Sequence, residues 1–369
     1  MNHICLIYNF AQHYRLGVFK LMDEKMNIDF YFGDEMGDVK KLDYKELEGF
    51  QKELRNVSLF SHFYWQSGAF KLLFDKRYRE YILLGDYYCV STWVILFFSL
   101  FTSKKMYLWT HGWYGKESRS IKIIKKAFFS MGDALFLYGD YAKRLMIKEG
   151  FAAEKLVVIY NSLNYKEQVG VRESLSVSNL YRSHFSNDDP VMIFIGRLTP
   201  VKKLHYIIEA QKALCDRGRM INLVIIGDGE EREHLRELVV KYHLNTRVWF
   251  VGKLYDETRI AEYIFNADIC VSPGNVGLTA MHALVYGTPV ITHNNFAYQM
   301  PEFEAIKDNI SGAFFEENNI DSLVKSIAIF LEKNTDRQIL RERCFEVIDE
   351  KFNPYYQVDK IKETIYGQG

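Results

Sequence analysis

The sequence has few cysteines and no apolar run long enough to cross a membrane. Its five cysteines form no Cys-x-x-Cys motif and no cluster with histidine, which argues against a structural zinc site and for a reducing compartment. The most hydrophobic window, residues 93–101, is well short of the ~20 residues that a membrane-spanning helix requires. This window predicts either a buried helix or a helix that rests on a membrane surface.

An excess of either sign of charge is also absent. Lys plus Arg and Asp plus Glu each number 47, so the formal net charge is zero. Proteins whose main partner is nucleic acid usually carry a basic surplus, so no nucleic-acid partner is expected. The first residues also lack the basic segment and the long apolar stretch of a signal peptide. We therefore expect a cytoplasmic protein.

The second half of the sequence alternates short apolar runs with segments of helical spacing. The apolar runs predict strands at residues 191–195, 223–226, 248–251, 269–271 and 289–291. The helical segments lie between them, at residues 203–217, 230–242, 256–266 and 278–286. Strands and helices that alternate at this spacing form a parallel sheet with crossover helices. The second half is therefore expected to be a Rossmann-like α/β domain.

The first half alternates in the same way but less regularly. Strands are expected at residues 4–8, 28–32, 81–84, 106–110, 134–138 and 156–159, with helices in the gaps. Residues 170–189 are polar, rich in serine and asparagine, and end at Pro190, as a linker or irregular segment does. The expected organisation is a Rossmann-like domain over residues 1–170, a second over residues 190–350, and a terminal segment over residues 351–369.

Two cations follow the first strand of the second half, in the sequence Gly196-Arg197-Leu198-Thr199-Pro200-Val201-Lys202-Lys203. In an open parallel sheet, ligands bind beyond the carboxyl ends of the strands. Gly196 allows a close backbone approach, and Arg197 and Lys202 place two positive charges at this edge. These features are typical of a phosphate site, although two solvated loop charges remain the alternative interpretation.

A second loop at the same edge opens a helix. It contains Asn275, Gly277, Leu278 and Thr279. A helix N-terminus presents free N–H groups that suit a diphosphate, Gly277 lets an anion approach, and Thr279 adds a hydroxyl. The turn that contains Gly227 resembles part of a dinucleotide fingerprint, but it is equally typical of a tight connection between a strand and a helix.

Aromatic and basic residues mark three segments of the first half. His111 follows a strand in an aromatic-rich loop, as in sugar sites, and a histidine that is satisfied within a structural loop is the alternative interpretation. Residues 9–15 follow the first strand, where their polar side chains can line an acceptor site. Residues 118–129, from Ser118 to Phe129, form a basic amphipathic helix. Such a helix either binds an anionic membrane or packs in a domain with a solvated face.

Taken together, these motifs resemble the GT-B glycosyltransferases of retaining family 4. The matching pieces are Gly196-Arg197-Leu198 with Lys202, Gly227-Asp228-Gly229, Gly277-Leu278, Gly287-Thr288-Pro289-Val290, Pro301-Glu302 and Ser311-Gly312. They span residues 191–315 in the order and at the spacing of the family. The first half matches more loosely, through His111-Gly112 and Asn161.

The resemblance implies two Rossmann-like domains that face each other across a cleft. The N-terminal domain would bind the acceptor, and the C-terminal domain would bind a nucleotide-sugar donor whose diphosphate Arg197 and Lys202 hold. It implies transfer with retention to a saccharide or lipid-linked saccharide in surface-polysaccharide synthesis. No metal or other cofactor is expected, because no Asp-x-Asp pair follows an apolar strand and cationic side chains are available for the diphosphate. His111 would hold the sugar or acceptor near the reacting centre. The terminal segment would cross back to the N-terminal domain, and membrane contact through residues 118–129 would place the protein at the inner face of the cell membrane.

The sequence departs from this family at two positions. The family carries two glutamates at the places of Gly274 and His282, the first touching the donor sugar and the second the ribose. His282 can still hydrogen-bond a ribose hydroxyl, whereas Gly274 cannot replace a carboxylate, so Asn275 or Glu302 would contact the sugar instead. Two alternatives to a transferase therefore stay open: a nucleotide-sugar epimerase with this fold, and an inactive sugar-nucleotide-binding assembly subunit.

Overall fold

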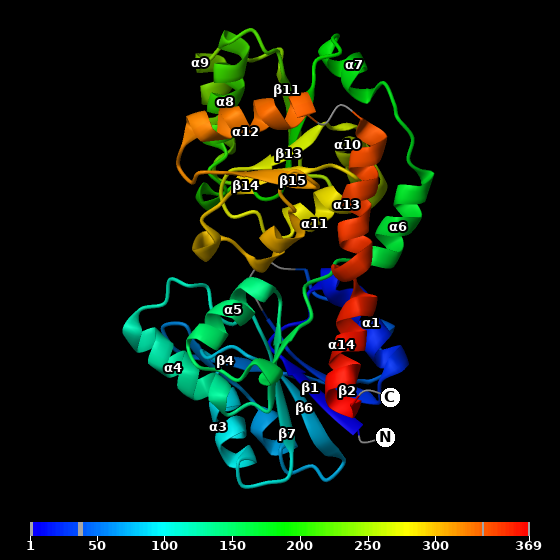
Figure 1. The fold of residues 1–369 in the computed structure, drawn as a ribbon. Coiled ribbons are helices and arrows are strands. Elements are labelled where there is room, and N and C mark those ends of the chain that lie inside the picture. The colour runs from blue at the N-terminus through cyan, green and yellow to red at the C-terminus, as the bar shows by residue number, and fades with distance from the viewer. Residues whose placement is uncertain (1–2, 36–39, 334–335, 368–369) are drawn as a thin grey trace. The chain divides into compact units, whose positions relative to one another are not determined.

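The computed structural model describes residues 3–35, 40–333 and 336–367, which form two compact units. The first unit contains the chain up to Asn164 together with the segment from Asn353 onward, and the second contains Tyr165–Phe352. Residues 1–2 and 368–369, at the outer ends of the expected domain ranges, lie outside the described residues. Each unit is an α/β layer structure with its own parallel sheet (Figure 1).

The second unit is built on a six-stranded sheet in the order β12-β11-β10-β13-β14-β15. The strands are β10 (Val191–Ile195), β11 (Asn222–Ile226), β12 (Val248–Gly252), β13 (Ile269–Ser272), β14 (Val290–His293) and β15 (Gly312–Phe315). The helices are α6 (Tyr165–Ser174), α7 (Leu180–Phe185), α8 (His205–Asp216), α9 (Arg232–Lys241), α10 (Glu257–Asn266), α11 (Thr279–Val285), α12 (Ile320–Lys333) and α13 (Arg337–Lys351). The strand order reverses between β10 and β13, so the loops after these two strands flank the switch point where ligands bind in such sheets.

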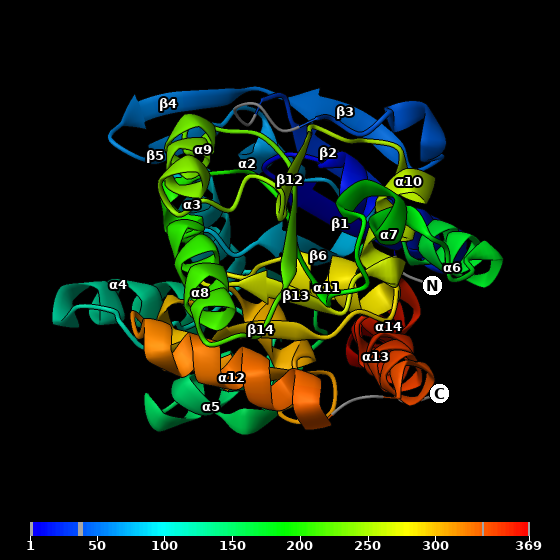
Figure 2. The ribbon, with the colours of Figure 1, turned by 90° about the horizontal axis from the view of Figure 1, so that it is seen from above.

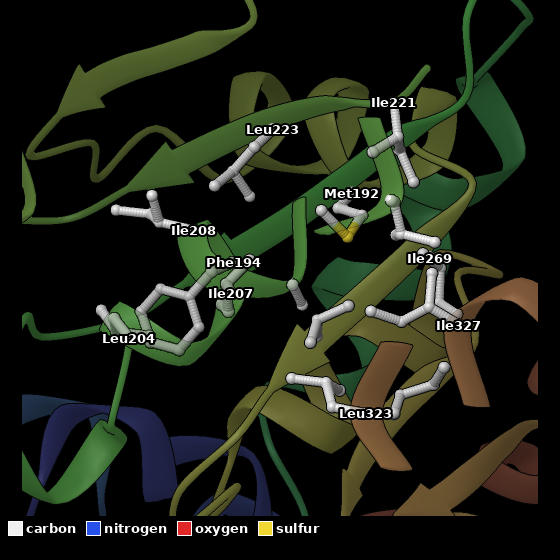
Figure 3. Close-up of a cluster of buried hydrophobic side chains, with 14 of the residues drawn as sticks. Met192, Phe194, Leu204, Ile207, Ile208, Ile221, Leu223, Ile269, Leu323 and Ile327 are labelled. Atoms are coloured by element: carbon white, nitrogen blue, oxygen red, sulfur yellow. The ribbon is translucent and has the colours of Figure 1, made fainter. Parts of the chain in front are cut away.

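Apolar strands buried on both faces hold the second sheet in place. Helices α8, α9 and α12 lie on one side of it and α10, α11 and α13 on the other (Figures 1 and 2). Met192 and Phe194 of β10 pack with Ile207 of α8 and Ile327 of α12 in one fully buried cluster (Figure 3). Because both faces of a parallel strand between two helical layers are buried, such a strand appears in the sequence as a continuous apolar run. The cluster fixes the carboxyl ends of β10 and β13, where the candidate site lies.

The first unit is built on a seven-stranded parallel sheet in the order β3-β2-β1-β6-β7-β8-β9. Its strands are β1 (His3–Tyr8), β2 (Ile28–Gly33), β3 (Phe50–Leu54), β6 (Tyr78–Leu84), β7 (Lys105–Thr110), β8 (Ala134–Leu137) and β9 (Leu156–Val158), and an antiparallel pair, β4 (Asn56–Phe60) and β5 (Phe63–Gln66), stands apart. The helices are α1 (Leu16–Lys25), α2 (Ala69–Leu72), α3 (Val90–Ser99), α4 (Arg119–Ser130), α5 (Asp140–Lys148) and α14 (Pro354–Tyr366). The switch point of this sheet lies between β1 and β6.

The last helix, α14, packs on the first unit beside α1. Val358 and Ile361 join the core cluster that also contains the buried face of α1. The Gln357 side chain donates to the carbonyl of Tyr160 at 2.8 Å and accepts from the hydroxyl of Ser162 at 2.8 Å. These contacts make the terminal segment part of the first unit.

The expectation of an α/β fold with two Rossmann-like parallel sheets is confirmed, and every strand predicted from an apolar run is present. The expectation that helices fill all the gaps of the first half is wrong, because β3, β4 and β5 lie there. Residues 170–189 are not an irregular linker either. They hold part of α6 and all of α7, whose buried Tyr181 donates its hydroxyl to the carbonyl of Tyr263 at 2.6 Å. The second unit therefore begins at Tyr165, before the expected boundary.

Helix α3 differs from the buried helix that its composition favours. Ile95 and Leu96 are buried in the core, but the side chains of Phe97, Phe98 and Phe101 on and after its last turn are 53%, 44% and 75% exposed. The buried-helix interpretation is therefore wrong for this outer face. Among the described residues, we find no helix with the length and hydropathy that a membrane span requires.

Helix α4 uses much of its positive charge within the first unit. Lys125 is buried and donates to the carbonyl of Gly112 at 2.6 Å and to Glu117 at 2.7 Å, and Lys122 pairs with Glu149. Less charge is left for an anionic membrane than the sequence indicates. Membrane contact through residues 118–129 stays a prediction.

Candidate functional site

In the second unit, the loop after β10 is held against the loop after β11 by backbone hydrogen bonds. The N–H of Gly196 donates to the carbonyl of Ile226 at 3.0 Å, and the N–H of Leu198 donates to that of Asp228 at 3.0 Å. A Cβ atom on Gly227 would lie 1.9 Å from the carbonyl oxygen of Gly196, so only glycine fits there. Gly227 thus supports the first loop by packing, and a contact between Gly227 and a phosphate stays a prediction.

The loop after β13 packs just as closely on the first loop. The N–H of Gly274 donates to the carbonyl of Lys202 at 3.0 Å, and a Cβ atom on Gly274 would lie 2.0 Å from the carbonyl oxygen of Val201. The Thr279 hydroxyl donates to the carbonyl of Ile195 at 3.0 Å, which ties the first turn of α11 to the end of β10. The hydroxyl proton of Thr279, which we expected to be available to a ligand, is donated to this carbonyl instead. The structure therefore brings both loops together at the switch point of the second sheet.

Lys202 reaches from the 3-10 turn Pro200–Lys202 to the loop that opens α11. Its Nζ donates to the carbonyl of Asn275 at 2.5 Å and lies 3.5 Å from that of Val276. A Cβ atom on Gly277 would lie 3.9 Å from the same nitrogen. An ammonium group has three N–H donors, so a third remains for an anion after these two carbonyl contacts. Leu278, half-buried, follows as the N-cap of α11.

Arg197 supplies a second positive charge to this edge. Its side chain is exposed and, within the part of the chain that the structure describes, makes no ion pair and no side-chain hydrogen bond. Burial lowers the pKa of the Lys202 ammonium, the charge of Arg197 lowers it further, and the two outweigh the carboxylate of Glu302 to bring it to about 8. Two cations close enough to disfavour each other's charge are stabilised by an anionic ligand.

The pKa of Lys202 predicts how anion binding depends on pH. The protonated ammonium binds an anion and the neutral amine does not, so the affinity for a nucleoside diphosphate should fall as pH rises through about 8. Phosphate groups with a second pKa of about 6 are already ionised above pH 7 and add little to this change. We expect the Kd, measured by calorimetry, to rise about thirtyfold between about pH 7 and 9.5. In Lys202→Arg, whose guanidinium stays charged, the rise should disappear; an equal rise in that variant would assign the titration to another group.

Gln299, which no sequence motif marks, holds the loop after β13 in place by two hydrogen bonds. Its Oε1 accepts from the N–H of Val276 at 2.8 Å, and its Nε2 donates to the hydroxyl of Thr292 at 2.9 Å. Glu302, on the 3-10 helix Pro301–Ala305, is 3% exposed and acts on Lys202 through its charge. Contacts of the Asn275 side chain or of Glu302 with a sugar stay predictions.

His282 lies on α11 and is bonded to a glutamate that the sequence analysis did not select. Its Nε2 is 2.9 Å from Oε1 of Glu257, which also accepts from Tyr286 at 2.6 Å and from Gln168 at 3.0 Å. Burial alone would raise the pKa of Glu257, but these hydrogen bonds and the charge of His282 lower it to about 2. The ionised carboxylate holds a proton on Nε2 of His282, so Nδ1 meets a ligand as an acceptor in the neutral ring and as a donor in the imidazolium. Glu257 comes from α10, 25 positions away, so local spacing could not reveal it.

In the first unit, His111 follows β7 and packs against Tyr138, with 4.7 Å between the ring centroids. Burial lowers the pKa of His111 to about 4, and the charges of Arg15 and Lys125 act in the same direction. The imidazole is therefore neutral near pH 7. Glu117 fixes the loop, because its carboxylate pairs with Lys125 and accepts two backbone N–H groups. His111 can thus offer one N–H donor and one nitrogen acceptor from a firm position.

Comparison with known proteins shows what this fold and this pair of loops are similar to. Residues 178–346, which contain the loops after β10, β11 and β13, match the family model described as glycosyl transferases group 1. Solved structures with the same two-sheet fold are glycosyltransferases as well. The family match thus lies in the second unit, and the solved structures share the GT-B fold with this chain.

Three relatives illustrate the likeness. The uncharacterized glycosyltransferase MJ1607 of Methanocaldococcus jannaschii is 27% identical over 225 residues, which are 58% of this chain and 53% of that protein. The chain thus spans about half the length of this curated relative. The structure of Anabaena Alr3699/HepE in complex with UDP has a TM-score of 0.74 at 15% identity and covers 99% of this chain and 100% of its own. The lipopolysaccharide outer core galactosyltransferase WaaB has a TM-score of 0.69 at 16% identity, with 99% of both chains covered.

Proposed function

We propose that this protein transfers a sugar from a nucleoside-diphosphate donor to a saccharide or lipid-linked saccharide acceptor in surface-polysaccharide synthesis. The observation that carries the proposal is the meeting of Lys202 with the loop after β13, beside Arg197, at the switch point of the second sheet. The UDP complex and the lipopolysaccharide galactosyltransferase among the similar structures support a diphosphate donor and a surface saccharide as acceptor.

In this proposal, the donor diphosphate lies against Arg197 and Lys202. A hydrogen bond between a cation and a phosphate oxygen contributes about 1.5–3 kcal/mol. These bonds strengthen as the bond between sugar and phosphate breaks, because negative charge grows on the leaving diphosphate. Helix α11 has only seven residues, so we assign most of this stabilisation to the two side chains rather than to the helix dipole.

The rest of the reaction follows the chemistry that the resemblance implies. The acceptor hydroxyl attacks from the face that the diphosphate leaves, and the leaving phosphate takes the hydroxyl proton, so the configuration is retained. This sequence of steps uses no protein nucleophile, no metal and no other cofactor. Neutral His111 orients the sugar or the acceptor through its ring nitrogens. His282, held by Glu257, would hydrogen-bond a ribose hydroxyl through Nδ1, as acceptor or donor.

A turnover assay distinguishes this function from the two alternatives. A thermal-shift screen of nucleoside diphosphates first identifies the base, because a bound ligand raises the apparent stability. A transferase then releases the diphosphate only when an acceptor is present. An epimerase would convert the donor sugar without an acceptor, and an inactive binding subunit would bind the donor without turnover.

Replacing Arg197 by alanine tests the assigned site in the same assay. We expect kcat/KM to fall at least about tenfold, since one charge-assisted hydrogen bond of about 1.5 kcal/mol or more is lost from the leaving group. Arg236→Ala is the matched control, because Arg236 is also exposed on the second unit and lies on α9. Turnover of Arg197→Ala equal to that of the Arg236→Ala control would contradict the proposal.

A further inference from the structure

A buried arginine of the first unit has no acidic partner among the residues that the structure describes. Arg15 ends the 3-10 turn His13–Arg15 that follows β1, and it is 6% exposed. Its guanidinium carbon lies 5.4, 5.6 and 5.5 Å from the ring centroids of Tyr8, Trp109 and Tyr138, and its Nη2 donates to the Tyr138 hydroxyl at 2.5 Å. We call these four residues the Arg15 cage. Across residues 3–35, 40–333 and 336–367, no carboxylate forms an ion pair with Arg15.

The cage contains hydrogen-bond donors that the protein does not use. Nε and Nη1 of Arg15 and Nε1 of Trp109 are buried and have no hydrogen-bond partner in the described parts of the chain. Burial raises the pKa of Tyr138, so its hydroxyl stays protonated and cannot neutralise the guanidinium. The aromatic rings offset part of the cost of burying a cation, but a cation without a counter-ion is otherwise unfavourable in a protein interior.

The cage lies at the edge of the first sheet where ligands bind. Tyr8 ends β1, Trp109 is near the end of β7 and Tyr138 directly follows β8, so the three rings come from the carboxyl ends of three strands. Half-buried His111 packs on the ring of Tyr138. The candidate for orienting the acceptor is therefore in contact with the residue that Arg15 bonds.

We propose that the Arg15 cage binds an anionic group of the acceptor, a carboxylate or a phosphate. This inference rests on the proposed function and narrows the acceptor to a charged one. Oxyanions accept hydrogen bonds without donating any, which suits a cluster of N–H donors around a positive charge. An uncharged sugar would leave the guanidinium without a counter-ion. Neutral His111 beside the cage adds no competing positive charge.

The test measures how strongly the full chain prefers an anion to its uncharged counterpart. Titrations use methyl glucuronide against methyl glucoside for a carboxylate, and a short-chain prenyl phosphate against its prenol for a phosphate. The starting protein carries Arg197→Ala and Lys202→Met, so that the donor cations do not bind the probes. We expect one of the two anions to bind at least about tenfold tighter than its uncharged counterpart. The pair of probes that shows this difference tells whether the acceptor group is a carboxylate or a phosphate.

Variants of the cage decide whether Arg15 causes the preference. Arg15→Met should remove the preference, and Arg15→Lys should keep part of it. Trp109→Phe keeps an aromatic ring but loses the N–H group. It should weaken the binding of the anion about threefold and leave the affinity for the uncharged probe unchanged. The proposal is overturned if the starting protein does not bind either anion more tightly than its uncharged counterpart. It is also overturned if Arg15→Met or Trp109→Phe leaves that preference undiminished. Failure of the proposed function would look different: the wild-type chain would bind no nucleoside diphosphate while the anion preference persisted.

Discussion

Replacing Lys202 by methionine is expected to weaken the binding of the nucleoside diphosphate about 100-fold. Methionine keeps most of the volume of the side chain but loses the charge, and an ionic hydrogen bond of about 3 kcal/mol corresponds to this factor. The upper end of the range applies because burial has already removed much of the water from the ammonium, as its pKa of about 8 indicates. Calorimetric titration of the diphosphate selected by thermal shift measures the effect.

Lys203→Met is the matched control for that variant. Lys203 is the next residue, but its ammonium is engaged by Glu317 at 2.7 Å and by Asn318 at 2.7 Å. Its removal takes the same charge from the same turn without touching the loop after β13, so the affinity should change by less than about threefold. Equal losses in the two variants would mean that net charge, rather than the position of Lys202, governs binding.

Substituting Gly274 by alanine or glutamate should destabilise the second unit and abolish donor binding. A Cβ atom at this position would lie 2.0 Å from the carbonyl oxygen of Val201 and 2.8 Å from the carbonyl carbon of Lys202. Both obstacles are backbone, which cannot rotate away, so we expect a loss of about 3 kcal/mol in the free energy of unfolding. The same displacement would separate Lys202 from Asn275 and Gly277, and the anion site would be lost with it.

Gly170→Ala serves as the control for this substitution. Gly170 lies within α6, and a Cβ atom there would meet nothing within 4 Å. Alanine in a helix should be neutral or stabilise the unit by up to about 1 kcal/mol. Urea unfolding reports the free energy for each variant. If Gly274→Glu unfolds like the wild type and binds donor more tightly, the close contact between the loops is wrong and the glutamate typical of the family is tolerated here.

Most strands of the two sheets could be predicted from the sequence because they contain short apolar runs, and β1 and β10 are examples that are buried on both faces. Val191–Ile195 is bounded as expected, since Pro190 and Gly196 flank an uninterrupted run. Strand β3 was not predicted, because it lies at the edge of its sheet and its sequence, Phe50–Leu54, is half polar. Helix α7 was not predicted, because only a few of its residues, chiefly Tyr181 and Phe185, are apolar and buried within a polar segment.

The candidate site was predictable where its residues follow strands, and it was not where contacts join distant segments. Arg197 and Lys202 could be selected because a glycine and two cations follow a clear strand. The sequence could not explain why position 274 is a glycine, because the backbone atoms that exclude a side chain there belong to residues 201–202. The bond between Glu257 and His282 and the cage around Arg15 also depend on the packing of separate elements.

In the proposed function, Arg197 and Lys202 bind one diphosphate together with the loop that opens α11. The most direct test is a crystal structure of the full chain with the nucleoside diphosphate that stabilises it most. We predict phosphate oxygens within about 2.7–3.2 Å of the Arg197 guanidinium, of Lys202 Nζ and of a backbone N–H between Gly277 and Thr279. A diphosphate bound elsewhere, or one that contacts neither cation, would contradict the assignment of these two residues.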